Sequence, residues 1–173
     1  GPNENYLQYA RTPLYPSAHS LLFDRNLDNE QFRCDFANRY ADLINTIFQI
    51  DDFNTEVDDL QSLIAQAMPD HVERWESPIS VNFWNNSIQN IKNYNANRIP
   101  TAREHVNSTL GFNGQVAVTL DVEPAEAGTI EISTISPEDY PWQGIYFNGC
   151  PVNISVQANE GYVFDHWGEN PFI

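Results

Sequence analysis

The carboxylate pairs Asp51-Asp52 and Asp58-Asp59 are the first candidates for chemistry, because neighbouring carboxylates can share a proton or hold a metal ion. Both pairs fall in a segment of helical periodicity, where adjacent residues point about 100° apart. The two carboxylates of a pair therefore do not share a face. No D-x-[DN]-x-[DN]-G loop is present to form a Ca²⁺ site. We interpret the first pair as a helix N-cap and the second as solvated surface.

The histidines and cysteines also lack catalytic spacing. No histidine has another four residues on, and His71 lies one helical step before Trp75, which favours a structural role. There is no G-x-S-x-G motif, no C-x-x-C pair and no zinc-ligand spacing. Cys34 falls in a helical pattern and Cys150 in a β pattern, and we favour two buried thiols. A disulfide between the two halves is the alternative in an oxidising compartment. We predict no catalytic or metal-binding residue.

The sequence does not indicate a nucleotide site. Phosphate loops need glycine, and residues 2–110 contain none. Asp35-Phe36 and Asp52-Phe53 are followed by alanine and asparagine instead of the glycine of a D-F-G motif. We therefore predict no cofactor for this chain.

The net charge of −16, with a single lysine, excludes other partner classes. Such a surface repels nucleic-acid phosphates and anionic lipid headgroups. The sequence contains no run of about 18 apolar residues, which would predict a membrane span. No signal peptide is visible either.

Glycine content divides the chain into two parts. No glycine occurs between Gly1 and Gly111, and seven occur from Gly111 onward. A helix-rich part therefore precedes a turn-rich part with β-strand alternation. We predict an α+β fold, with a helical module at residues 1–112 and a small, mainly antiparallel β module at residues 113–173.

The helical module is predicted to hold about five helices after an extended lead-in at residues 3–17. We expect segments at 17–27, 29–48, 51–67 and 70–75, one that starts at Ser80, and a last one from Pro100 to Leu110. The apolar stripe expected for 29–48 comprises Phe32, Phe36, Tyr40, Leu43, Ile44, Ile47 and Phe48. The inner face expected for 51–67 comprises Val57, Leu60, Leu63, Ile64 and Ala67.

The β module is predicted to hold four strands, at residues 115–122, 129–135, 144–147 and 151–158. Its aromatic residues are expected mostly to fill a small core. The alternative is an interaction surface for a glycan or a surface protein, formed by Trp142, Tyr146 and Trp167.

Three blocks in the helical module resemble one family. The first is the F-R-x-x-F-x-x-R-Y-A-D-L-I-N-T block, with Phe32, Arg33, Phe36, Arg39, Tyr40, Ala41, Asp42, Leu43, Ile44, Asn45 and Thr46. The second contains Met68, Pro69, His71, Val72, Arg74 and Trp75, and the third is NRIPTAREHVNSTLGF, which carries Ile99 before Pro100. Over about residues 17–112 the chain is similar to the C-terminal helical region of CotH-type (spore coat protein H) kinase-like proteins.

This resemblance implies part of a kinase-like C-lobe from a bacterial, secreted or cell-surface atypical protein kinase. The nucleotide and metal carboxylates of the family lie in a segment before these helices, so ATP and Mg are implied only for that upstream segment. The upstream segment is then the expected partner of this chain. Apolar stripes that it would cover should be left as an exposed patch on the helical module.

The β segment resembles a different family, the extracellular B-repeat of internalin (InlB) type. The matching residues are Gly144, Tyr146, Gly149, Val152, Ile154, Gly161, Tyr162, Phe164 and Trp167. The resemblance implies a further strand after the last of these, so we expect the β module to be truncated. It also implies an alternative function, an extracellular module for adhesion or for binding carbohydrate or protein.

Overall fold

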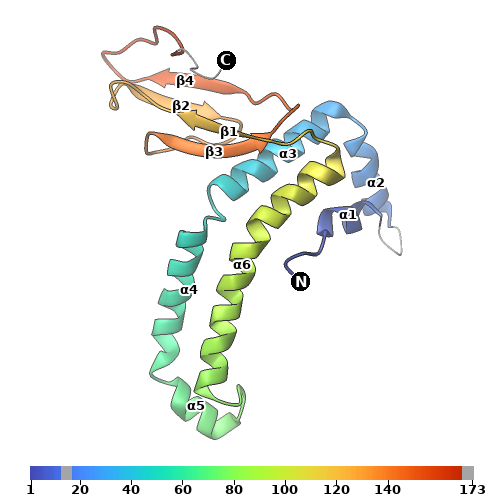
Figure 1. Cartoon of the computed structure of the whole chain (residues 1–173). Coiled ribbons are helices and arrows are strands. Elements are labelled where there is room, and N and C mark those ends of the chain that lie inside the picture. The colour runs from blue at the N-terminus through green and yellow to red at the C-terminus, as the bar shows by residue number, and fades with distance from the viewer. Residues whose placement is uncertain (13–16, 169–173) are drawn as a thin grey trace.

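The computed structural model describes residues 1–12 and 17–168, and its fold is α+β, as predicted. The helices are α1 (Tyr6–Arg11), α2 (Ala18–Leu27), α3 (Glu30–Asn45), α4 (Ile50–Ala65), α5 (Met68–Trp75) and α6 (Val81–Leu110). The strands are β1 (Gln115–Leu120), β2 (Gly128–Ile132), β3 (Trp142–Phe147) and β4 (Ile154–Ala158). Figure 1 shows the strands lying over α3, and α4–α6 extending away as a hairpin.

Helix α3 begins where the sequence predicts and ends earlier. The Asn29 side chain accepts a hydrogen bond from the Phe32 N–H, which caps the first turn. The predicted end at Phe48 is wrong. The N–H groups of Ile47 and Phe48 both donate to the Leu43 carbonyl, and this shared acceptor ends the regular helix. Both side chains are exposed.

Helix α4 starts one residue before the predicted cap. Gln49 takes the N-cap position without a side-chain hydrogen bond, and Asp51 and Asp52 lie in the first turn. Their interpretation as an N-cap is therefore wrong, although carboxylates in a first turn still favour the positive end of the helix macrodipole.

Helix α6 is one continuous helix, so the prediction that Pro100 begins a separate helix is wrong. An internal proline removes one backbone hydrogen bond and crowds the preceding turn. Beyond it, Ala102, Val106 and Leu110 are buried, and their packing stabilises the helix across the proline. Gly111 follows with φ of 75° and caps the helix end, as predicted.

The lead-in expected to be extended contains a helix, α1. Asn5 caps it, and the Arg11 guanidinium bonds both Asp24 (2.8 Å) and the Thr109 carbonyl (2.8 Å). These long-range contacts order a segment that shows no apolar period of its own. Residues 13–16, also part of the predicted lead-in, lie outside the described residues.

The strands form two antiparallel pairs, β1 with β3 and β2 with β4. Gln115 pairs with Phe147 at one end of the first pair, and Gly128 pairs with Ala158 at one end of the second. The first two strands end before the predicted limits, and β4 begins later than expected. Residues 162–168 contain no strand, and residues 169–173 lie outside the described residues.

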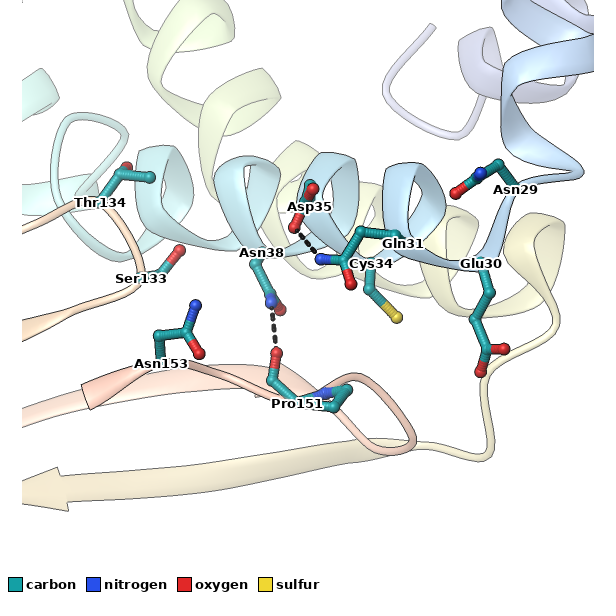
Figure 2. A pocket seen from close by; sticks show the side chains of 10 residues that line it. All are labelled: Asn29, Glu30, Gln31, Cys34, Asp35, Asn38, Ser133, Thr134, Pro151 and Asn153. Atoms are coloured by element: carbon teal, nitrogen blue, oxygen red, sulfur yellow. Dashed lines mark hydrogen bonds between the residues drawn. The ribbon is translucent and has the colours of Figure 1, made fainter.

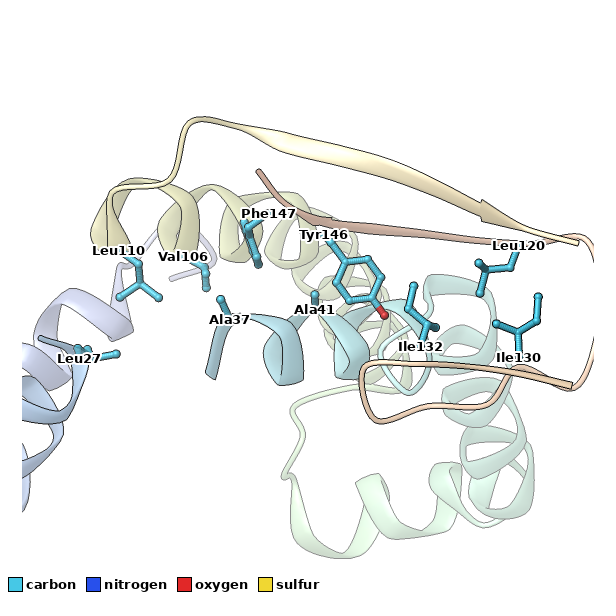
Figure 3. Packing of buried hydrophobic residues seen from close by; sticks show 10 residues of the cluster. All are labelled: Leu27, Ala37, Ala41, Val106, Leu110, Leu120, Ile130, Ile132, Tyr146 and Phe147. Atoms are coloured by element: carbon cyan, nitrogen blue, oxygen red, sulfur yellow. The ribbon is translucent and has the colours of Figure 1, made fainter. Parts of the chain in front are cut away.

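The hydrophobic core lies between α3 and the strands (Figure 3). Its members are Leu27, Ala37, Ala41, Val106, Leu110, Leu120, Ile130, Ile132, Tyr146 and Phe147. The two alanines of α3 allow β3 to approach the helix closely. Helices and strands thus contribute to one cluster of buried residues.

The face predicted to be buried is wrong on α4 and only partly right on α3, where Phe36 and Tyr40 pack against the core. Helix α3 buries the side that carries Cys34, Ala37, Asn38, Ala41, Asp42, Ile44 and Asn45. Apart from Ile44, its predicted apolar stripe is half-buried or exposed. Helix α4 buries no residue, and Leu60, Leu63 and Ile64 are all exposed. Apolar periodicity located these helices and did not reveal which neighbours are present to cover them.

Among the residues that the structure describes, no helix is sufficiently long and apolar to cross a membrane.

Candidate functional site

The contact between α3 and the strands is polar at its centre. Asp42 is completely buried, at 0% exposure, and accepts four hydrogen bonds from the strand side. Its Oδ1 accepts from the Tyr146 hydroxyl at 2.7 Å. Its Oδ2 accepts from the Ser133 hydroxyl (2.7 Å) and from the Thr134 hydroxyl (2.7 Å) and N–H (3.1 Å). A buried carboxylate is tolerated when its oxygens are bonded in this way.

A second set of contacts lies one turn further along α3. The Asn45 side chain bonds both polar groups of the Ile145 backbone, at 3.0 and 3.1 Å. Arg103 of α6 donates to Asn45 Oδ1 (2.8 Å) and to the Ile145 carbonyl (3.0 Å). We call the side chains of Asp42, Asn45, Arg103 and Tyr146 the polar joint. It fixes β3 against two helices.

Burial perturbs two groups of the polar joint. Burial raises the pKa of the Tyr146 hydroxyl far above its ordinary value, and its hydrogen bond to Asp42 raises that pKa further. Burial lowers the pKa of the Arg103 guanidinium, and the neighbouring Tyr146 and Tyr40 oppose that shift. Tyr146 therefore remains a hydrogen-bond donor throughout the physiological pH range, which suits a positioning role.

The two cysteines form a disulfide, so the favoured interpretation of two buried thiols is wrong. Cys34 of α3 and Cys150 of the turn after β3 are 116 residues apart in sequence, and their Cα atoms are 5.2 Å apart. Close by, the Asn38 side chain donates to the Pro151 carbonyl at 2.8 Å. The sequence could not show that the fold places this turn on the N-terminal half of α3.

A pocket of about 700 Å³ lies beside this disulfide (Figure 2). It is lined by Asn29, Glu30, Gln31, Cys34, Asp35, Asn38, Ser133, Thr134, Pro151 and Asn153. Its two charged residues are both carboxylates, and one of them, Asp35, accepts from Gln31 at 2.8 Å. This pocket has the wrong charge for a phosphate.

All eight basic side chains of the chain already have a partner. The arginines contact Asp24, Asp28, the Leu27 carbonyl, Thr134, the Trp75 ring, the Pro2 and Glu4 carbonyls, and Asn45. Lys92 pairs with Asp58. Within the described ranges, no group of three or more His, Cys, Asp or Glu side chains could hold a metal ion.

The residues proposed from sequence as an interaction surface have different environments. Tyr146 is 2% exposed and belongs to the core and to the polar joint, so its side chain does not lie on the surface. Trp142 is half-buried over Gly144, where a Cβ would lie 2.2 Å from the indole ring. Trp167 is 51% exposed and contacts Phe164 edge to face. Of these three residues, Trp167 is the most available to a ligand.

The other residue weighed for chemistry, His71, has a structural contact. Its Nε2 lies 2.9 Å from the Ser77 carbonyl and ties the end of α5 to the loop that follows. The Trp75 ring is covered by the Arg74 guanidinium, 4.9 Å from the ring centre. His71 and Trp75 are remote in sequence from the residues of the polar joint and do not contact them.

A second candidate site is the hairpin, which we call the arm: α4, α5 and the part of α6 from Val81 to Asn95. Within the arm, Met68 is the one buried residue. The two long helices contact each other through Gln61 and Asn85 (2.9 Å) and through the Lys92–Asp58 ion pair. These contacts define the inner side of each helix.

One side of the arm is apolar. Counting about 100° per residue from the inner side of each antiparallel helix places Leu60, Ile64 and Ile91 on one side of the hairpin. The same count places Leu63, Phe83 and Tyr94 toward the outer edge of their own helix, next to that side. We call these residues the apolar flank: Leu60, Leu63, Ile64, Phe83, Ile91 and Tyr94. The opposite side carries exposed polar residues: Asp51, Thr55, Ser62, Asn82, Asn86, Gln89 and Asn93. The arm is therefore amphipathic, and its apolar side is uncovered.

A sequence signal for the polar joint lies in α3. Asn38, Asp42 and Asn45 recur at helical spacing and share a side of the helix with Ala37 and Ala41. Small residues interleaved with polar ones on one helix face indicate close packing against backbone polar groups. The large apolar residues, from which the buried face of this helix was predicted, lie mostly on its other sides.

The comparisons with known proteins bear on the helical part of the chain. A family model described as CotH kinase protein matches residues 6–101. No curated protein and no solved structure matches the chain. The match ends before the first strand, so the resemblance of the β segment to B-repeats stays a prediction. Since the match covers more than half of the sequence and includes the motif that supplies Asp42 and Asn45, the chain belongs to the CotH kinase protein family.

Proposed function

We propose that this chain is the non-catalytic C-terminal portion of a CotH-like atypical protein kinase, with a structural, scaffolding or regulatory role. An upstream kinase-like segment of the same protein packs on its helices. The observation that carries this proposal is the uncovered apolar flank of the arm. Leu63 is 78% exposed, and five other large apolar side chains of the two helices, on that side or at its outer edges, are 42% to 55% exposed. Contiguous apolar surface of this kind marks an interaction site.

The charge distribution supports the non-catalytic part of the proposal. Transfer of a phosphoryl group needs cations or backbone N–H groups around the phosphates. Here every basic side chain already has a partner, and the charged residues that line the pocket beside the disulfide are both carboxylates. This charge distribution supports our proposal that ATP and Mg belong to the upstream segment.

The non-catalytic role is tested by titration of this chain with ATP and Mg²⁺ in a calorimeter, followed by an assay for transfer of labelled phosphate. We expect no binding heat and no labelled protein. The longer protein that includes the upstream segment is the positive control. Turnover by this chain alone would contradict the proposal.

The scaffolding role is tested by hydrogen exchange of the arm in this chain and in the longer protein. We expect the amides of α4 and α6 to exchange more slowly in the longer protein, because the covering segment stabilises both helices. The amides of β1 and β3, which are far from the arm, provide the internal control. Equal exchange of the arm in both proteins would show that nothing packs on it.

We also propose a secreted or cell-surface location. The Cys34–Cys150 disulfide supports it, because disulfides persist in oxidising compartments and are rare in a reducing cytosol. Alkylation of cell fractions before and after reduction, with mass spectrometry of the two cysteine peptides, measures the state in the cell. Free thiols in the native protein would contradict the proposed location.

An alternative function, an adhesion module that binds a glycan or a protein, is favoured by the end of the β segment. Phe164 and Trp167 are half exposed, Val163 is more so, and all three line a groove of about 280 Å³. A glycan array with the full chain tests this alternative. Binding should be lost in Trp167→Ala and kept in Trp75→Ala, a matched change at an exposed tryptophan of the arm tip. The same result for both variants would remove the alternative.

A further inference from the structure

The apolar flank has an acidic border. Along α4, Glu56 lies four residues before Leu60, and Asp59 lies four residues before Leu63. Asp52 extends the row by one more turn. Residues four apart are neighbours on a helix surface, so these carboxylates lie next to the apolar residues, on the edge away from α6.

No basic side chain of the described residues neutralises this border. Asp52, Glu56 and Asp59 form no ion pair within residues 1–12 and 17–168. Helix α4 contains no lysine or arginine, and Lys92 is held by Asp58 on the inner side of the arm. A segment that covers the flank therefore meets unneutralised negative charge along one edge.

We propose that the apolar flank binds a basic amphipathic helix, with apolar residues seated between α4 and α6 and lysine or arginine residues facing the acidic border. The inference rests on the proposed function and specifies the chemistry of the segment that packs on the arm. A helix fits because two antiparallel helices present a groove into which the side chains of a third can pack. The 16 residues of α4 span about 24 Å, which sets the length of the partner helix.

Charge excludes the other occupants of the flank. A second copy of this chain also carries −16 and would place one acidic border against another. An anionic membrane surface is repelled for the same reason. A neutral apolar helix would leave the carboxylates at the edge of a partly dehydrated surface without counter-charge, which is unfavourable.

The test uses two synthetic amphipathic helices of roughly 16–18 residues. Both carry the same leucine face, and one has lysine and the other glutamate on the polar face. Binding to the full chain is measured by fluorescence anisotropy at two salt concentrations. We expect the lysine peptide to bind at least tenfold more tightly than the glutamate peptide and to weaken as salt rises, because screening reduces the attraction.

Variants of the chain separate specific binding from general attraction to an acidic protein. Leu63→Ser, at an exposed position, should weaken binding of the lysine peptide about tenfold. The triple change Asp52→Asn, Glu56→Gln and Asp59→Asn should weaken it about fivefold or more. The charge-matched triple Asp121→Asn, Glu138→Gln and Asp139→Asn, at exposed positions of the β segment, should leave it unchanged.

Three outcomes would overturn the inference. The first is equal affinity for the lysine and glutamate peptides. The second is a lysine-peptide affinity that Leu63→Ser does not change. The third is a dimer of the chain that dissociates in Leu63→Ser, which would make a second copy the occupant. If the arm is protected from exchange in the longer protein and the lysine peptide does not bind, the scaffolding proposal stands and this inference fails.

Discussion

The two ends of the molecule are built on opposite principles. In what we call the body, which comprises α2, α3, the last part of α6 and the four strands, large side chains are buried around a carboxylate that has all its hydrogen-bond partners. In the arm, two helices of good amphipathic pattern touch along one side and leave an apolar side uncovered. The body also has a disulfide that joins its helical and β parts, whereas the arm contains no cysteine.

This difference shows where the stability of the chain resides. Packing and buried hydrogen bonds fix the body as a unit, and they hold only one end of the arm in place through α6. The uncovered side of the arm contributes less to folding than the body, because its apolar residues keep 42% to 78% of their surface in water. We therefore expect substitutions in the body to change stability and substitutions on the apolar flank to change binding.

The largest effect is expected from loss of the disulfide. A bridge between residues 116 positions apart removes much of the freedom of the unfolded chain. Reduction should therefore lower the free energy of unfolding by about 4–5 kcal/mol. Urea unfolding with and without a thiol reductant measures this. The double variant Cys34→Ala and Cys150→Ala should be equally destabilised and insensitive to the reductant, and an unchanged midpoint in reduced wild-type protein would show that the bridge does not stabilise the body.

The next effect is expected at the centre of the polar joint. Asp42→Ala leaves the buried Tyr146 hydroxyl without an acceptor and also removes the hydrogen bonds from Ser133 and Thr134, so we expect the free energy of unfolding to fall by about 4 kcal/mol. Asp35→Ala is the matched control, because this exposed carboxylate of the same helix accepts a hydrogen bond from Gln31 and has no other side-chain partner in the part of the chain that the structure describes. The free energy of unfolding of this control should fall by no more than about 0.5 kcal/mol. Similar losses in the two variants would show that the polar joint does not hold the body together.

Matched truncations of apolar residues test the comparison directly. Ile132→Ala, at a position with 0% exposure, creates a cavity and should cost about 3 kcal/mol. Leu63→Ala on the apolar flank removes side-chain atoms that are mostly in water and should cost less than about 0.5 kcal/mol. Chemical unfolding of both variants is the measurement. A large loss in Leu63→Ala would mean that the flank is already covered in this chain.

The smallest effect is expected at high pH. The pKa of Tyr146 is raised in the folded state by burial and then by its hydrogen bond to Asp42, while the unfolded value is about 10. Below pH about 10 both states keep the proton and the contribution to stability is complete. Above it the unfolded state loses its proton first, so stability falls by at most about 1.4 kcal/mol per pH unit.

Unfolding midpoints of the wild type and Tyr146→Phe between pH 8 and pH 11, in steps of about half a unit, test this dependence. The other seven tyrosines titrate in both proteins and cancel in the difference. We expect the two curves to converge as the pH rises. Parallel curves would show that the Tyr146 proton is not linked to folding.

Local sequence signals predicted much of the fold. The start of the helix near residue 29, the break between the helices predicted at 51–67 and 70–75, the change of period near Gly111 and the positions of four strands all depend on the few residues around them. The same kind of signal failed at Pro100, because the burial of Val106 and Leu110 against distant elements overrides the local cost of a proline in the helix. It also failed for α1, whose contacts involve residues about 100 positions away.

The candidate sites were less predictable than the elements. An amphipathic pattern shows that a helix has an apolar side, and it does not show whether another element is present to cover that side. This is why Leu60 and Leu63 were expected inside and are exposed. Asp42 is the opposite case, because a polar residue on a helix is buried where three residues from remote segments donate hydrogen bonds to it.

The amino-acid sequence by itself determined the α+β class, the approximate elements and the family likeness, because periodicity, turn residues and motifs are properties of short segments. Only the tertiary structure decided that Cys34 bonds Cys150, that Asp42 and Tyr146 form a buried contact, and that the apolar side of the arm is left open. Each of these depends on which residues far apart in the chain meet in space, and that depends on the packing of the whole molecule.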